Sequence, residues 1–130
     1  MEVAKLVSSW SKDPEKQVGC VIVDKNHRII STGYNGYSKG MNDSDSVNRL
    51  SKVIHAEVNA IIHAGRERCI GSVMYLVGIE RNSSAILSDL PCNMCQRVIQ
   101  NAGISTIITY NNELNVEMNK VLEYITEECQ

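Results

Sequence analysis

Long apolar segments are missing from this sequence. None approaches the length of about 20 residues that a helix needs to cross a bilayer. The first residues, MEVAKLVSSWSKDPEKQ, also lack the basic start and apolar centre of a secretory signal. We therefore expect no membrane partner and a cytoplasmic location, or the cytoplasm of the host if the source is a virus.

Clustered positive charge is missing as well. The 13 lysines and arginines are scattered along the chain, and the formal net charge is −2. Proteins that bind a duplex or a long RNA usually carry a basic patch or stripe. The sequence therefore predicts that long nucleic acid is not a partner.

A disulfide framework is not indicated either. Such frameworks use an even number of cysteines in exported chains, whereas this sequence has an odd number and no export signal. Thiolate chemistry or metal binding is the better explanation for some of these cysteines. The five are Cys20, Cys69, Cys92, Cys95 and Cys129.

Apolar residues at helical spacing predict three amphipathic helices. The first lies before Pro14, the second begins near Ile54, and the third lies at the C-terminal end of the sequence. The predicted apolar faces are Val3, Leu6, Val7 and Trp10 in the first helix, Val58, Ile61 and Ile62 in the second, and Leu114, Met118, Val121, Leu122 and Ile125 in the third.

Strand patterns alternate with these helices. β-branched and apolar runs predict a hairpin around a polar turn, followed by two further strands. Between those two strands, Pro91 and Gly103 mark the start and end of a fourth helix. Strands are expected at 18–23, 28–32, 72–79 and 104–110, a surface loop or lid at 36–46, and another loop at 80–90.

The resulting order, α-β-β-α-β-α-β-α, predicts an α/β fold. Strands that alternate with helices in this way favour a three-layer α/β/α sandwich with a mixed central sheet. At 130 residues the chain is most simply one domain, covering residues 1–130.

Cys92 and Cys95 form a C-x-x-C pair at the start of the fourth predicted helix. Residues three apart lie about 60° apart around a helix, so both thiolates can face one ion. The partial positive charge at a helix N-terminus favours the thiolate forms that metal binding requires. Two buried thiols, or a redox pair, remain alternative explanations for this pair taken alone.

His55 is the third candidate ligand, since it stands at the start of the second helix. With the two cysteines it would give zinc three protein ligands and leave a fourth position open, as in catalytic zinc sites. Water at that position becomes a nucleophile near neutral pH. The sequence therefore predicts one catalytic zinc per chain.

Glu57 stands two residues after His55, a spacing that does not suit joint ligation from one helix face. A carboxylate beside the open position can instead accept the proton of the water and pass it to the substrate. The arrangement H-x-E followed by P-C-x-x-C is typical of zinc-dependent nucleobase deaminases. Here it is His55-Ala56-Glu57 followed by PCNMC at residues 91–95.

The sequence resembles the deoxycytidylate (dCMP) deaminase family of the cytidine deaminase-like superfamily. The segments that carry this resemblance are SKDPEKQVGCVIVD, GYNG, HAEVNAI and PCNMCQRVIQNAGI, which together extend over most of the chain. The resemblance implies the cytidine deaminase-like sandwich and hydrolysis of dCMP to dUMP and ammonia, which supplies deoxyuridylate for thymidylate synthesis. It also implies a homo-oligomer, with a hexamer favoured.

The resemblance carries several roles over by position. His55, Cys92 and Cys95 would hold zinc, and Glu57 would shuttle protons. Asn35 would hydrogen-bond the deoxyribose 3′-hydroxyl, and the Ala56 backbone N–H would hold the pyrimidine carbonyl.

Allosteric regulation is a further implication of the resemblance. Family members are often activated by dCTP and inhibited by dTTP at a separate site that uses magnesium and the GYNG loop. Gly33, Tyr34 and Gly36 are the candidate effector-loop residues here. A tight turn explains the same three residues without any ligand.

Two departures from the family pattern bear on the substrate. GIERNSSAILSDL carries extra residues before Pro91, and Ser38 stands where a proline is common. Both positions lie where a nucleotide or a neighbouring subunit would make contact. We therefore keep dCTP as a possible second substrate beside dCMP.

Two other functions fit parts of the pattern. A tRNA adenosine deaminase shares the zinc motif but needs a basic RNA surface, which the acidic charge balance does not favour. A non-catalytic zinc or nucleotide-sensing module would explain the ligands and leave Glu57 without a role.

Overall fold

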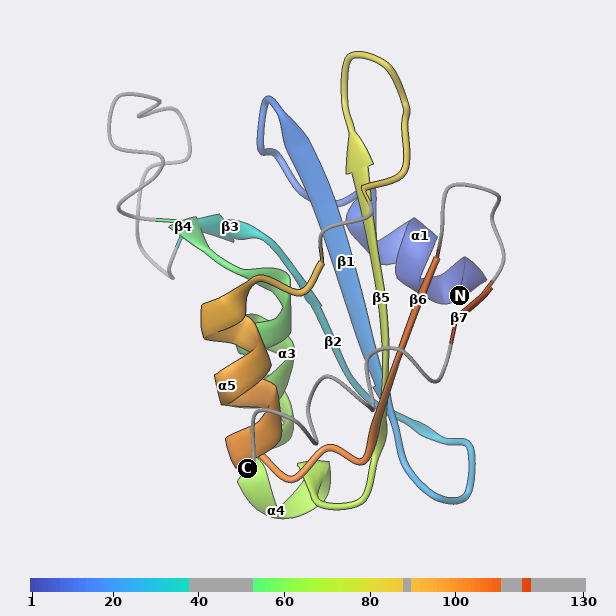
Figure 1. Cartoon of the computed structure of the whole chain (residues 1–130), viewed down its shortest axis with the longest axis vertical. Helices are drawn as coiled ribbons and strands as arrows, with labels where there is room; N and C mark the ends of the chain where they lie inside the picture. The colour runs from blue at the N-terminus through green and yellow to red at the C-terminus, as the bar shows by residue number, and fades with distance from the viewer. Residues whose placement is uncertain (38–52, 88–89, 111–115, 118–130) are drawn as a thin grey trace.

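The computed structural model describes residues 1–37, 53–87, 90–110 and 116–117 (Figure 1). Within these ranges the main sheet has five strands in the order β2-β1-β5-β6-β7. Strand β1 is antiparallel to β2 and β5, β5 is parallel to β6, and β6 is antiparallel to β7. The sheet is therefore mixed, as predicted. Its strands are β1 (Lys16–Val23), β2 (Ile29–Tyr34), β5 (Val73–Glu80), β6 (Thr106–Tyr110) and β7 (Val116–Glu117).

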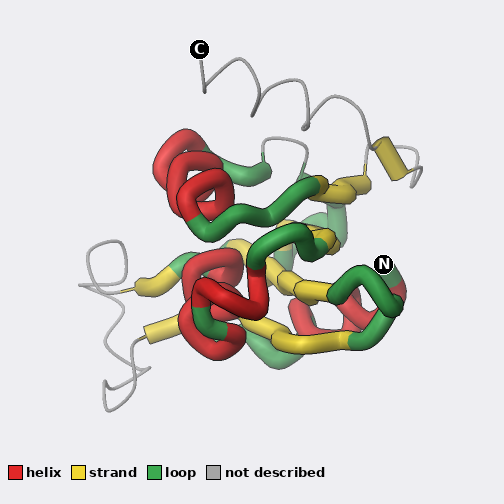
Figure 2. The backbone as a smooth tube through the Cα atoms, turned by 90° about the horizontal axis from the view of Figure 1, so that it is seen from below, coloured by secondary structure: helices red, strands yellow, loops and turns green. Residues whose placement is uncertain are grey.

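Helices cover both faces of this sheet. Helix α1 lies on one face, and α3 and α5 lie side by side on the other (Figures 1 and 2). This is the predicted three-layer arrangement. No helix in the described ranges has the length and apolar character needed to cross a membrane. The remaining elements are α1 (Glu2–Ser8), β3 (Gly36–Tyr37), β4 (Val53–Ile54), α3 (Ala56–Ala64), α4 (Arg66–Cys69) and α5 (Asn93–Asn101).

The core is divided between the two faces because side chains alternate along each strand. In β1, Cys20 and Ile22 belong to the larger cluster under α3 and α5, whereas Val21 belongs to the smaller cluster under α1. In β5, Leu76 and Val77 are divided in the same way. The larger cluster therefore joins both helices that begin near the candidate site.

The predicted apolar face is largely wrong for the first helix and wrong at one of three residues for the second. Val3, Leu6 and Trp10 of the first predicted stripe are 42%, 58% and 49% exposed, and only Val7 of that stripe is buried. Ile62 of the second stripe is 65% exposed, while Val58 and Ile61 are partly buried. Small residues face the sheet instead: Ala4 and Ser8 in α1, and Ala56, Ala60 and Ala64 in α3.

Two glycines explain why small residues occupy these contacts. A Cβ atom at Gly33 of β2 would lie 2.5 Å from the Ala56 carbonyl oxygen and 2.6 Å from the Ala60 nitrogen. A Cβ atom at Gly19 of β1 would meet α1 in the same way, 2.5 Å from the Ser8 nitrogen. Without these Cβ atoms each helix backbone lies directly on a strand, and larger apolar side chains point away from the contact.

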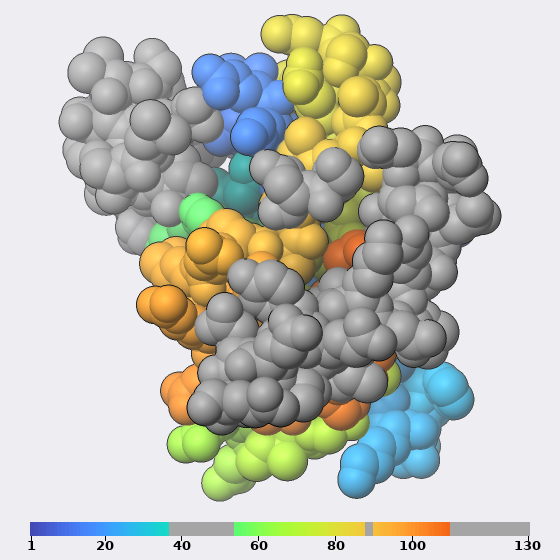
Figure 3. All heavy atoms as spheres, viewed as in Figure 1, coloured from blue at the N-terminus to red at the C-terminus, as the bar shows by residue number. Residues whose placement is uncertain are grey.

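The predicted hairpin is confirmed, and a side chain shapes its turn. Asp24 Oδ1 accepts hydrogen bonds from the Asn26 and Arg28 backbone N–H groups, each at 2.9 Å. His27 in the same turn has a φ of 62°. The turn and α4 lie at one end of the molecule, and residues 11–15 and the loop after β5 lie at the other (Figure 3).

Two predicted elements fall mainly outside the described residues. The lid at 36–46 is described only at Gly36–Tyr37, which pair with β4 as a short antiparallel ladder. The C-terminal helix is described only at Val116–Glu117, which pair with β6 as strand β7. The prediction of helix is therefore wrong at Val116–Glu117, and the rest of that predicted helix lies outside the described residues.

Candidate metal centre

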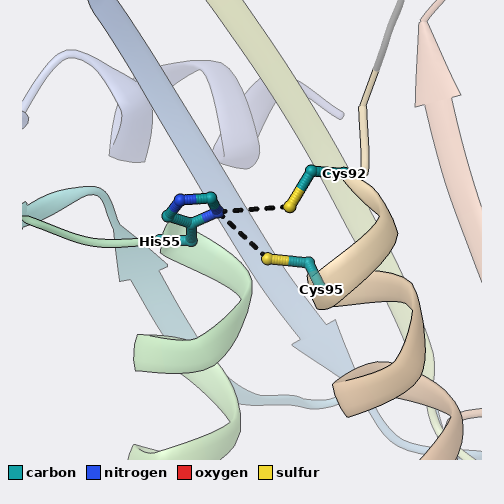
Figure 4. A group of neighbouring side chains, drawn as sticks. All are labelled: His55, Cys92 and Cys95. Atoms are coloured by element: carbon teal, nitrogen blue, oxygen red, sulfur yellow. Dashed lines mark hydrogen bonds between the residues drawn. The ribbon is translucent and has the colours of Figure 1, made fainter. Parts of the chain in front are cut away.

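Three side chains meet where α3 and α5 begin. The Nδ1 atom of His55 lies 3.1 Å from Cys95 Sγ and 3.5 Å from Cys92 Sγ (Figure 4). The donor atoms of all three residues lie within 4.8 Å of one another. The structure thus brings together the three residues that the sequence predicts as ligands, although they lie on two separate helices.

Helix capping positions aim these side chains at one point. His55 is the N-cap of α3, with φ −68° and ψ 150°, and Cys92 is the N-cap of α5, with φ −70° and ψ 166°. Cys95 follows in the first turn of α5. An N-cap residue has extended backbone, so the helical angle between residues two apart does not apply to His55 and Glu57. This resolves their spacing: His55 reaches outward from the cap, and Glu57 points into the protein.

The geometry and chemistry of the donors fit zinc. With Zn–N of about 2.0 Å and Zn–S of about 2.3 Å, tetrahedral geometry separates a nitrogen from a sulfur ligand by about 3.5 Å. The distance from His55 Nδ1 to Cys92 Sγ is 3.5 Å, and the distance to Cys95 Sγ, at 3.1 Å, is slightly shorter. One imidazole and two thiolates leave a fourth position for a water molecule. The first turns of α3 and α5 add two partial positive charges that favour anionic ligands.

Glu57 lies beneath this cluster in α3 and is 2% exposed. Burial raises the pKa of its carboxyl, while hydrogen bonds from its own backbone N–H and from the Cys95 thiol, together with the charge of His55, lower that pKa to a smaller extent. Its Oε2 atom is buried and has no hydrogen-bond partner. A buried polar atom without a partner costs free energy and needs an explanation.

The surroundings of Cys95 favour its neutral thiol, and a bound cation would offset them. Burial raises the pKa of the Cys95 thiol, and the Glu57 carboxylate and neighbouring Cys92 raise it further. Such surroundings disfavour a thiolate unless positive charge lies nearby. Zinc supplies that charge and deprotonates coordinating thiols. The four cysteines that the structure describes, Cys20, Cys69, Cys92 and Cys95, are free of disulfides.

Asn35 directly follows β2 and is 7% exposed. Its side-chain Oδ1 accepts a hydrogen bond from the Val18 N–H at 2.9 Å, and its Nδ2 donates to the Lys16 carbonyl at 2.8 Å. The amide therefore binds the start of β1. Because an amide oxygen has two lone pairs and the NH₂ group has two protons, each atom retains capacity for a ligand.

The other resemblance-based residues lie near this position. Ala56 is the first residue of α3, where backbone N–H groups lack partners within the helix. Gly33 is explained by its close contact with α3, and Gly36 has open space around it. Tyr34 is 41% exposed and packs edge to face against Trp10, with ring centroids 6.3 Å apart. Their effector role stays a prediction.

Gln96 is a residue near the site that sequence reasoning missed. Its Nε2 donates to the Pro91 carbonyl at 2.8 Å, and its backbone N–H donates to the Cys92 carbonyl at 2.9 Å. It therefore braces the turn that presents Cys92. The available signal was its place in α5, four residues after the capping cysteine, where an N–H bonds back to the cap.

The chain matches a family model and curated sequences. Residues 1–111 match the model described as the cytidine and deoxycytidylate deaminase zinc-binding region. An uncharacterized deaminase in the luxG 3′ region of Aliivibrio fischeri is 39% identical over 110 residues, which cover 82% of this chain and 66% of that protein. Human deoxycytidylate deaminase is 35% identical over 118 residues, covering 83% of this chain and 60% of that protein.

A solved structure supports the fold. The dCMP deaminase of cyanophage S-TIM5, crystallised with dCMP and dUMP, superposes with a TM-score of 0.67 at 23% identity. The match covers 95% of this chain and 87% of the phage chain. By contrast, this chain spans only 60% to 66% of the length of the two curated relatives.

Proposed function

Because this chain belongs to the cytidine and deoxycytidylate deaminase family, we propose that it is a zinc-dependent deaminase of a deoxycytidine nucleotide. The reaction replaces the 4-amino group of dCMP by oxygen, giving dUMP and ammonia. The dUMP would supply thymidylate synthesis. Glu57 carries this proposal, because a buried carboxyl with one unpartnered oxygen lies beside a His-Cys-Cys cluster.

A purely structural zinc site gives Glu57 no purpose. Burying an ionisable carboxyl costs free energy, and such a cost is usually retained where the group has a chemical role. A carboxyl whose pKa is raised by burial is also better matched to proton transfer near neutral pH than an exposed one. Its surroundings therefore favour catalysis over metal-dependent folding alone.

The chain's own residues account for the proton transfers. His55, Cys92 and Cys95 would hold zinc, and a zinc ion held there would lower the pKa of water towards neutrality. Glu57 accepts the proton that the attacking water loses. It passes this proton to N3 of the pyrimidine, then accepts the remaining proton of the added hydroxyl group and passes it to the amino group at C4, which leaves as ammonia as the C4=O bond forms.

Groups beside the His-Cys-Cys cluster would orient the substrate. The Ala56 N–H at the start of α3 would donate to the pyrimidine carbonyl, where the positive end of the helix favours partial negative charge. Asn35 would hydrogen-bond the 3′-hydroxyl through the capacity that its bonds to β1 leave unused. Both roles rest on the resemblance and on these positions.

Ammonia release from a panel of substrates tests the proposal. Zinc-loaded protein should act on dCMP and leave adenosine in tRNA unchanged, with deoxycytidine much slower than dCMP. Turnover of tRNA alone would replace the proposal with the RNA-editing alternative. Stoichiometric zinc without turnover of any compound would favour the non-catalytic sensing module.

Several finer features stay predictions and can be measured in the same preparation. Turnover of dCTP would extend the substrate range to the triphosphate. Assays with dCTP or dTTP, with and without Mg²⁺, test the effector loop at Gly33, Tyr34 and Gly36. Light scattering tests the predicted hexamer. Limited proteolysis tests the prediction of a single domain over residues 1–130, and fractionation of source cells tests the cytoplasmic location.

A further inference from the structure

A second group of buried polar side chains lies away from the metal-site cluster, where the segment before β1 meets the end of β2. Ser11, Asp13 and Asn35 are 2%, 7% and 7% exposed. Figure 1 shows this segment beside the loop that leaves β5. Arg81, an exposed residue directly after β5, connects the two.

The Arg81 side chain makes two hydrogen bonds across this junction. Its Nε donates to the Asp13 carbonyl at 2.8 Å, and its Nη2 donates to the Ser11 carbonyl at 2.9 Å. Its backbone N–H adds a bond to the Glu15 carbonyl at 2.8 Å. The planar guanidinium is suited to hold two acceptors at once, which a single ammonium group does not do in the same geometry.

Ser11 passes this restraint on to Asn35. Its hydroxyl donates to the Asn35 carbonyl at 2.8 Å and accepts the Asp13 N–H at 3.2 Å. Asn35 in turn accepts the Val18 N–H through its side-chain oxygen. Hydrogen bonds to and from Ser11 therefore link Arg81 to the backbone carbonyl of Asn35, the residue whose side-chain amide is predicted to meet the sugar.

We propose that Arg81 is a positioning residue for Asn35, acting through Ser11 and the segment before β1. It fixes the carbonyls of Ser11 and Asp13, which fixes the Ser11 hydroxyl and so the backbone of Asn35. The consequence for binding rests on the proposed nucleotide function, whereas the consequence for the Asn35 side chain does not. The two parts can therefore fail separately.

Amide hydrogen exchange tests the structural part without any substrate. The Val18 N–H bonds to the Asn35 side chain, so its exchange rate reports whether that amide stays in place. In Arg81→Met, which keeps an unbranched stem and removes the side-chain donors, Val18 should exchange about tenfold faster. Amides in the sheet centre, such as Ile22 and Leu76, should be unaffected.

Two further variants make this result decisive. Arg68→Ala removes an exposed arginine on α4 and should leave Val18 exchange unchanged. Ser11→Ala keeps Arg81 and removes only the hydroxyl link, so it should accelerate Val18 even if Arg81→Met does not fold. Unchanged Val18 exchange in folded Arg81→Met or in Ser11→Ala, or equal acceleration of Ile22 and Leu76, would overturn the proposal.

Kinetics test the binding part. Since Asn35 is expected to contact the sugar and not the reacting carbon, Arg81→Met should raise the KM for dCMP about threefold to tenfold and change kcat less than about twofold. The KM of Arg81→Lys, which has one donor group, should lie between those of the wild type and Arg81→Met. Zinc content should stay at the wild-type level in both variants. A fall in kcat with unchanged KM would contradict the positioning role. Wild-type protein without dCMP turnover would instead refute the proposed function and leave the exchange result standing.

Discussion

Glu57 and Asn35 are both buried polar residues beside the candidate site, yet their surroundings are opposite. Both side-chain polar atoms of Asn35 bind the backbone of β1. One oxygen of Glu57 has no partner, and the carboxyl lies beside a thiol and an imidazole. Asn35 therefore stabilises the fold, whereas burial of Glu57 lowers the free energy of unfolding.

This contrast separates the frame of the site from its chemistry. A satisfied buried group is rigid because every alternative position loses a hydrogen bond. An unsatisfied one is available to a ligand or a reacting molecule. Variants of the two residues should therefore change different properties: stability for Asn35, and turnover for Glu57.

Removing a metal ligand should have the largest effect. Cys95→Ser replaces a buried thiolate ligand, so we expect zinc below stoichiometric content and no detectable deamination. Zinc at a thousandfold excess over its dissociation constant stabilises a fold by about 4 kcal/mol, and this part should be lost. Metal analysis and thermal unfolding measure both. A chelator should lower the Tm of the wild type and leave that of the variant unchanged; stoichiometric zinc in the variant would contradict the ligand assignment.

Glu57→Gln should have the next largest effect and should separate chemistry from folding. Glutamine keeps the shape of the side chain and cannot accept the proton, so turnover should fall by about 10²- to 10⁴-fold. The urea midpoint should stay the same or rise, because a buried ionisable group is replaced by a neutral one. Steady-state ammonia release and urea unfolding provide the two measurements. Unaltered turnover with bound zinc would rule out Glu57 as the proton carrier.

Asn35→Ala should show the opposite pattern in stability. It leaves the buried Val18 N–H and the Lys16 carbonyl without their side-chain partner, at a cost of about 2–4 kcal/mol in unfolding free energy. Urea unfolding measures the loss. Asn101→Ala, at an exposed position in the last turn of α5, serves as the control and should change stability by less than about 0.5 kcal/mol. Equal stability of the two variants would remove the contrast with Glu57.

Asp24→Asn should have the smallest effect, since this carboxyl binds backbone N–H groups as Asn35 does but lies in solvent. Hydrogen bonds from Arg28 and Asn26 lower the pKa of Asp24, the Arg28 bond contributing most. Its folded-state pKa thus lies below the unfolded value of about 4, so its contribution is present above pH 4 and is lost as pH falls through the folded pKa. Urea midpoints of wild type and variant should converge in acid. A constant difference between about pH 7 and about pH 2 would contradict this origin.

Much of the fold was predictable because local patterns agree with it. The hairpin, the strand at 73–80 and the helix after Pro91 occur where the sequence places them. The helix faces were predicted less well, because most of the large apolar residues at helical spacing in α1, and Ile62 in α3, are exposed. The useful signal was alanine at Ala56, Ala60 and Ala64, which matches the close approach that Gly33 permits.

The candidate site was predictable to a different extent at each residue. Zinc ligands must combine particular donors at short spacing near helix starts, so the cluster of His55, Cys92 and Cys95 could be predicted from sequence. The two side-chain hydrogen bonds of Arg81 reach Asp13 and Ser11, which lie 68 and 70 positions away in sequence, and no local pattern indicates them. The same holds for the bonds from Asn35 to β1, which depend on how the end of β2 meets the start of β1.

The separation of the predicted zinc ligands along the chain has a consequence for biosynthesis. His55 and Cys95 are 40 residues apart in sequence and come from different helices. Because synthesis proceeds from the N-terminus, a nascent chain first exposes His55 as a single donor. One imidazole does not retain zinc against competing cellular ligands, so loading must wait until α5 has been made and has docked beside α3. Zinc uptake during translation would therefore report the moment at which these two helices come together.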